Sequence, residues 1–164
     1  MSAPPLGTAA LRAVIFDIGD TLIHAASPTT ATAGLTAAPI GDAIADLRML
    51  GARYRLAAVT DTWVMTAADV RDALDRSGFE GLLDPIITSV DIGAAKPDPR
   101  GLLAALRELE VTPEEALFIG NADVDRQAAA AAAVPFALFD GTLEIGAIVD
   151  EHVARRQSPR VSPA

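Results

Sequence analysis

Short apolar runs alternate with helix-like segments along this chain, and the alternation limits its possible folds more than any other feature. The runs are continuous rather than alternating in polarity, as expected for strands buried on both faces. They lie at residues 12–17, 55–60, 85–89, 116–120 and 135–140. Parallel strands need a helical crossover between them, so this order predicts an α/β domain. We expect a three-layer, Rossmann-like parallel sheet of about five strands with helices on both faces.

The segments between these runs carry helix-end signals. Thr66 is a suitable N-cap and Gly78 a suitable stop for one of them. Asp98 followed by Pro99 is a typical N-cap and first-turn pair. The predicted helices cover residues 39–52, 66–78, 98–110, 122–133 and 142–153.

The chain has 164 residues, which favours a single domain with a substantial core. We place this domain at residues 12–153. The flanking residues 1–11 and 154–164 are rich in Pro, Ser and Ala, and we expect them to be disordered tails. Cysteine is absent, which excludes a disulfide framework, a thiolate zinc site and a cysteine nucleophile.

The net charge of −9 argues against coating of nucleic acid and against binding to anionic membranes, since both need a basic face. No apolar run has the length of a transmembrane helix, and the N-terminal residues lack the pattern of a secretory signal. We therefore expect a cytoplasmic location.

Chemically versatile side chains follow the carboxyl ends of the predicted strands, where ligand sites of parallel sheets lie. They are Asp17, Thr60, Lys96, Asn121, Asp123 and Asp125. Singly, each is an ordinary turn, cap or surface residue, so the functional argument depends on their joint order. A carboxylate can attack a phosphoryl group or an activated carbon, and a hydroxyl and an ammonium can hold the oxygens of that group. A further oxygen cluster can hold Mg²⁺.

The segments "FDIGDTL", "VTD", "GAAKPDP" and "FIGNADVD", in this order, resemble the four motifs of the haloacid dehalogenase (HAD) superfamily. The resemblance spans residues 12 to about 140. It implies that Asp17 is the nucleophile and that Thr60 and Lys96, the only lysine of the chain, bind the phosphoryl group.

The same resemblance implies a magnesium ion. Its ligands would be the carboxylate of Asp17, the backbone carbonyl of Gly19, and the side chains of Asn121 and Asp125.

The first motif departs from the pattern of HAD phosphatases, DxDxT, whose second Asp is the general acid and base. Gly19 stands at that position here, and Asp20 follows one residue later. Loss of a general acid and base slows reactions that need proton transfer by roughly 10²–10⁴-fold. Asp20 is the candidate replacement, although a turn or capping role suits it better. We therefore expect slow turnover that favours good leaving groups.

The fourth motif and the missing cap domain also differ from typical members. Asn121 stands where the family typically has an aspartate, and its neutral side chain lowers the expected affinity for metal. Asp123 or Asp125 could restore this affinity, or they could serve only as caps of the helix. The gaps on either side of Thr60 are too short for a cap, so the loop 24–38 is the candidate flap. Trp63 would either border the entrance or be a partly buried anchor.

Three functions remain open. The leading one is a Mg²⁺-dependent phosphatase that forms an aspartyl-phosphate on a phosphorylated small molecule or a larger phosphorylated substrate. A metal-independent dehalogenase is a lower alternative, because "GNA" at residues 120–122 is similar to the "SNA" of such enzymes, whereas their cap is missing. The third is a catalytically weak or inactive HAD fold that serves as a binding or regulatory module. An uncapped site also makes a homodimer an expectation.

Overall fold

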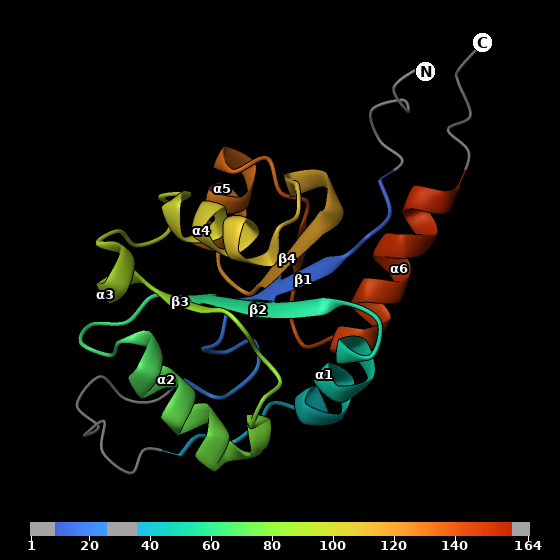
Figure 1. The fold of residues 1–164 in the computed structure, drawn as a ribbon. Helices are drawn as coiled ribbons and strands as arrows, with labels where there is room; N and C mark the ends of the chain where they lie inside the picture. The colour runs from blue at the N-terminus through green and yellow to red at the C-terminus, as the bar shows by residue number, and fades with distance from the viewer. Residues whose placement is uncertain (1–8, 26–35, 159–164) are drawn as a thin grey trace.

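The computed structural model describes residues 9–25 and 36–158, and its centre is a parallel sheet in the strand order β3-β2-β1-β4-β5 (Figure 1). The strands are β1 (Ala13–Phe16), β2 (Arg55–Thr60), β3 (Ile86–Thr88), β4 (Ala116–Gly120) and β5 (Phe136–Leu138). β1 occupies the middle, where Ala13 is in register with Arg55 of β2 and with Ala116 of β4. The predicted parallel α/β sheet of five strands is confirmed.

Helices cover both faces of the sheet, which gives the predicted three layers (Figure 1). On one face lie α1 (Ala43–Gly51), α2 (Ala67–Leu74) and α6 (Ile145–Gln157). On the other face lie α4 (Arg100–Leu109) and α5 (Asp123–Ala131).

The residues of β1 alternate between two hydrophobic clusters, one on each face. Val14 and Phe16 pack in the cluster beneath α1, α2 and α6, whereas Ala13 and Ile15 pack in the cluster beneath α4 and α5. Successive strand residues point to opposite faces, and all four are fully buried. A strand covered on both sides therefore reads as one continuous apolar run, and its carboxyl end lies at the centre of the sheet edge.

The start of α2 is the capping box that its sequence indicates. The Thr66 hydroxyl accepts a hydrogen bond from the backbone N–H of Asp69 (3.4 Å), and the Asp69 carboxylate accepts one from the N–H of Thr66 (2.9 Å). The helix continues as a π-helical turn, Asp75–Phe79, in which Gly78 has a φ of 96°. Gly78 is thus the stop, as predicted.

Two short helices have no counterpart in the prediction, namely α3 (Ser89–Ile92) and a 3₁₀ turn at Pro113–Glu115. Each is shorter than the span over which helical periodicity can be recognised. Among the described residues, no helix has both the length and the apolar character needed to cross a membrane.

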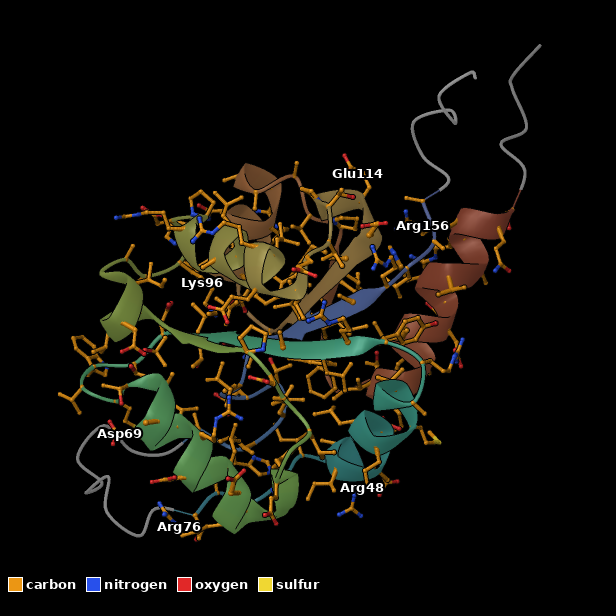
Figure 2. All side chains as sticks on the ribbon, viewed as in Figure 1. Arg48, Asp69, Arg76, Lys96, Glu114 and Arg156 are labelled. Carbon is orange, nitrogen blue, oxygen red and sulfur yellow. The ribbon has the colours of Figure 1, made fainter. Side chains whose placement is uncertain are left out.

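The predicted boundary of the C-terminal tail is wrong, because residues 154–157 belong to α6. The ion pair between Arg155 and Glu151 lies along this last part of the helix. Arg156 donates hydrogen bonds to the carbonyls of Ala9 and Glu114, and this anchors the helix end to the rest of the domain (Figure 2). The remaining tail residues 1–8 and 159–164, and most of the predicted flap, lie outside the described residues.

Candidate active site

Asp17 directly follows β1, so the central strand places its carboxylate at the middle of the carboxyl edge of the sheet. Its backbone N–H donates to the carbonyl of Ile119 in β4 (2.9 Å), which extends the strand pairing by one residue. The residue is only 7% exposed. The carboxylate is therefore held at the end of the central strand and is largely shielded from water.

Lys96 lies on the loop between α3 and α4, and its side chain joins two carboxylates. The peptide bond from Lys96 to Pro97 is cis. The ammonium nitrogen Nζ lies 2.6 Å from Oδ1 of Asp17 and 2.7 Å from Oδ1 of Asp125, and it donates to the carbonyl of Val59 (3.3 Å). Figure 2 shows Lys96 beside the carboxyl ends of the strands. With 9% exposure, it is a buried cation between two buried anions.

Burial and charge shift the pKa values of this group in opposing ways. Burial raises the pKa of the Asp17 carboxyl, and contact with Lys96 opposes this rise without cancelling it. Burial by itself would lower the pKa of Lys96, but the neighbouring carboxylates of Asp17 and Asp125 outweigh it and the pKa rises. Lys96 therefore stays charged at neutral pH.

Asp125 is the structural support of this arrangement. It is 1% exposed, and its Oδ2 accepts hydrogen bonds from the backbone N–H groups of Asn121 (3.1 Å) and Ala122 (3.0 Å) at the start of α5. A Cβ at position 120 would lie 2.5 Å from this oxygen, so only glycine allows the carboxylate to approach. Asp125 thus combines a helix cap with the anchoring of Lys96.

Thr21 connects the first and fourth motifs. Its buried hydroxyl Oγ1 lies 3.4 Å from Oδ2 of Asp17 and 3.4 Å from Oδ1 of Asn121. A hydroxyl has one hydrogen and can donate to only one of these oxygens at a time. The two oxygens therefore converge on one place with a surplus of acceptors, which is suitable for a hard cation.

The predicted Mg²⁺ ligands fit such a cation only in part. Asp17 and Asn121 converge as described, whereas both oxygens of Asp125 are already engaged by Lys96 and by backbone amides. The residues described contain no group of three or more His, Cys, Asp or Glu side chains that could hold a metal ion. Of the predicted ligands, the structure thus brings together only the side-chain oxygens of Asp17 and Asn121, and the role of the Gly19 carbonyl stays a prediction.

Thr60 is the last residue of β2 and is buried in register with Thr88 of β3, at the same sheet edge as Asp17. Next to it, Oδ1 of Asp61 accepts a hydrogen bond from the backbone N–H of Lys96 (3.2 Å). Asp61 and Thr21 are site residues that the sequence argument did not assign. Both lie inside the quoted motifs, and this position in the motifs is the sequence signal that could have identified them.

Asp20 and Asp123 are not brought into this cluster by any described contact. Asp20 has a φ of 56°, and its Oδ1 accepts a hydrogen bond from the N–H of Ala25 (3.0 Å), as in a turn. Asp123 is exposed and is bound by Arg126 and Gln127 of its own helix. Their contacts are those of a turn residue, for Asp20, and of a surface residue, for Asp123.

Residues 61–95, between the second and third motifs, contain α2, the π turn, β3 and α3. Trp63 is 89% exposed, so it is not a buried anchor.

The chain belongs to the haloacid dehalogenase-like hydrolase family, whose model matches residues 37–139. The match includes Thr60, Lys96, Asn121 and Asp125 and begins after Asp17. The chain is therefore a hydrolase of this family, in agreement with the resemblance of its motifs.

Individual relatives include both phosphatases and dehalogenases. Over 75 residues the chain is 35% identical to a glyceraldehyde 3-phosphate phosphatase of Methanopyrus kandleri, and the alignment spans 46% of this chain and 30% of that protein. The structure of a HAD-superfamily hydrolase of subfamily IA from Geobacter sulfurreducens shares the fold, with a TM-score of 0.65, 20% identity and coverage of 84% of this chain and 93% of that one. An L-2-haloacid dehalogenase is 28% identical, with a TM-score of 0.55 and coverage of 63% and 42%, respectively.

Proposed function

We propose that the protein hydrolyses phosphoric monoesters through an aspartyl-phosphate on Asp17. The observation that carries the proposal is the buried Asp17–Lys96–Asp125 cluster at the central sheet edge of a chain from this hydrolase family. The similarity to a curated phosphatase supports the choice of phosphoryl transfer.

In the first step, a carboxylate oxygen of Asp17 attacks phosphorus and forms a P–O bond. The bond between phosphorus and the ester oxygen breaks, and its electron pair leaves with that oxygen. In the second step, water attacks phosphorus, the bond to Asp17 breaks, and hydrogen phosphate and a proton are released. Asp17 returns to its ionised state, so the cycle consumes one ester and one water.

Thr60 and Lys96 would support this chemistry by binding the phosphoryl oxygens, for which Lys96 would exchange one of its contacts with Asp17, Asp125 and the carbonyl of Val59. Lys96 holds the carboxylate of Asp17 in place and offsets negative charge near an anionic substrate. Mg²⁺, held by Asp17, Gly19 and Asn121, would supply further positive charge for the phosphoryl oxygens. Asp125 would act by positioning Lys96 and not as a metal ligand.

Glycine at position 19 has no side chain that could donate a proton to the ester oxygen. Leaving groups that are stable as anions do not need this proton, whereas simple alkoxides do. Slow turnover with a preference for good leaving groups follows from this.

The proposal is tested by assaying an aryl phosphate and a 2-haloacid, with Mg²⁺ and with EDTA, against the Asp17→Asn variant. Metal-dependent release of phosphate that disappears in Asp17→Asn supports it. The matched control is Asp123→Asn, which removes a carboxylate that is exposed and lies outside the cluster.

Metal-independent dehalogenation is the second candidate, favoured by the neutral Asn121 and by the 28% identical dehalogenase. Asp17-dependent release of halide in the presence of EDTA would replace the first proposal by this one. Absence of Asp17-dependent turnover of either substrate, together with no binding of Mg²⁺, would instead indicate a binding or regulatory module.

A further inference from the structure

The loop of residues 61–65, between β2 and α2, exposes two large apolar side chains next to the site. Trp63 is 89% exposed and Val64 is 70% exposed. Burial of large apolar side chains is the main driving force of folding, so two adjacent ones facing water call for an explanation.

Hydrogen bonds hold this loop at both of its ends. The N–H of Thr62 donates to the Ser89 hydroxyl (2.9 Å), which itself donates to the carbonyl of Thr62 (3.1 Å). The hydroxyl of Thr62 also donates to the carbonyl of Met65 (2.6 Å). Trp63 and Val64 form the tip of a fixed loop, so their exposure is a defined feature of the fold.

The same loop is joined to the catalytic lysine. Asp61 accepts a hydrogen bond from the N–H of Lys96, and Thr60 precedes it at the end of β2. Three residues of extended chain span about 10 Å at most, so the Cα atom of Trp63 lies no farther than this from that of Thr60. A leaving group that projects from the phosphoryl group toward this loop would therefore come within reach of the indole. Figure 1 shows the loop running beyond the carboxyl end of β2.

We infer that Trp63 is a specificity-determining residue that binds a flat aromatic leaving group, which makes aryl phosphates the preferred substrate class. The inference rests on the proposed function. Two independent features agree on it, because the indole at the tip of the loop offers a ring for stacking and Gly19 offers no proton to the leaving group. An aryl ester suits both, since a phenolate departs with the electron pair of the broken P–O bond without first taking a proton.

A binding measurement uses Trp63 as its own reporter, because it is the only tryptophan of the chain. Phenyl phosphate is titrated into the Asp17→Asn variant, with excitation at a wavelength where phenyl phosphate does not absorb. Stacking removes water from the indole and is expected to shift its emission to shorter wavelength. The inference is overturned if saturating phenyl phosphate shifts the indole emission no more than glycerol phosphate does.

A kinetic measurement compares kcat/KM for phenyl phosphate with that for acetyl phosphate, which has a good leaving group but no ring. In Trp63→Ala this ratio is expected to fall about 3–10-fold, the range of aromatic pair contacts, through a higher KM for phenyl phosphate. Trp63→Phe keeps a ring and should retain most of the ratio. Met49→Ala, an equally apolar exposed position on α1, serves as the matched control.

The two failures are distinguishable. If wild type shows no Asp17-dependent hydrolysis of acetyl phosphate, the proposed function is overturned, and the inference with it. Asp17-dependent hydrolysis of acetyl phosphate with an unchanged ratio in Trp63→Ala leaves the proposed function in place and overturns the inference alone.

Discussion

Replacing Gly19 by aspartate should convert this protein into a faster phosphatase for substrates with poor leaving groups. The position accepts a side chain, because among the residues that the structure describes an added Cβ would meet only the Cβ of Ala25, at 3.6 Å, and the backbone of Gly19 is not in the left-handed region. A non-glycine residue at such a position also reduces the freedom of the unfolded chain. We therefore expect Gly19→Asp to fold normally.

The size of the gain follows from the chemistry of the new carboxyl group. In extended chain, residues two apart lie on the same side with their Cα atoms about 6.6 Å apart, and we take this value as the separation of the two carboxylates. At that distance, and at an effective dielectric constant of about 20, two carboxylates repel each other by about 2.5 kcal/mol, part of which Lys96 offsets. This repulsion raises the pKa of the new carboxyl toward neutrality, which favours a general acid. General acid catalysis should then increase kcat/KM by roughly 10²–10⁴-fold, or about 2.7–5.5 kcal/mol.

The assay compares glycerol phosphate with 4-nitrophenyl phosphate in wild type, Gly19→Asp and Gly19→Asn. Only Gly19→Asp should gain on glycerol phosphate, and its gain on 4-nitrophenyl phosphate should be much smaller because nitrophenolate needs no proton. Equal rates in Gly19→Asp and Gly19→Asn would refute the reasoning. So would a wild-type rate on glycerol phosphate that is already that of an ordinary phosphatase.

Three further predictions concern the cluster and the cap of α2. Asp125→Ala should lower the free energy of unfolding, measured by urea denaturation, by about 3 kcal/mol, because it leaves Lys96 and two amides short of a partner. Asp123→Ala, at an exposed position, should change it far less. Asn121→Asp should strengthen Mg²⁺ binding about tenfold by calorimetric titration, since it adds a charged ligand, and an unchanged affinity would remove position 121 from the metal site. Hydrogen bonds from Thr66 lower the pKa of Asp69, so the stability that this cap provides is present above the ordinary carboxyl pKa and lost as pH falls through the lowered value. Asp69→Asn should accordingly show a smaller loss of stability in acid than wild type.

The sheet and the position of Asp17 could be predicted because both depend on local patterns. A strand that is buried on both faces must be apolar throughout, and Asp17 interrupts such a run where β1 ends. The capping box at Thr66 likewise uses residues three apart in the sequence. These features are visible without any knowledge of the fold.

The role of Asp125 could not be predicted because it depends on contacts between distant segments. Its bond with Lys96 joins α5 to the loop before α4, and a helix cap and a metal ligand have the same sequence signature. The hydroxyl contacts of Thr21 have the same origin. The exposure of Trp63 depends on Ser89, which lies in α3, a helix of one turn that has no periodicity to detect.

The central position of β1 has a consequence for folding. Asp17 and Thr21 approach Asn121 only when β1 is paired with β4, a contact between segments about one hundred residues apart, and Lys96 requires β3 and α3 as well. Contacts at such separations form late and slowly in folding. Recovery of catalysis during refolding should therefore lag behind recovery of helical signal, and no fragment that lacks β1 or β4 can assemble this centre.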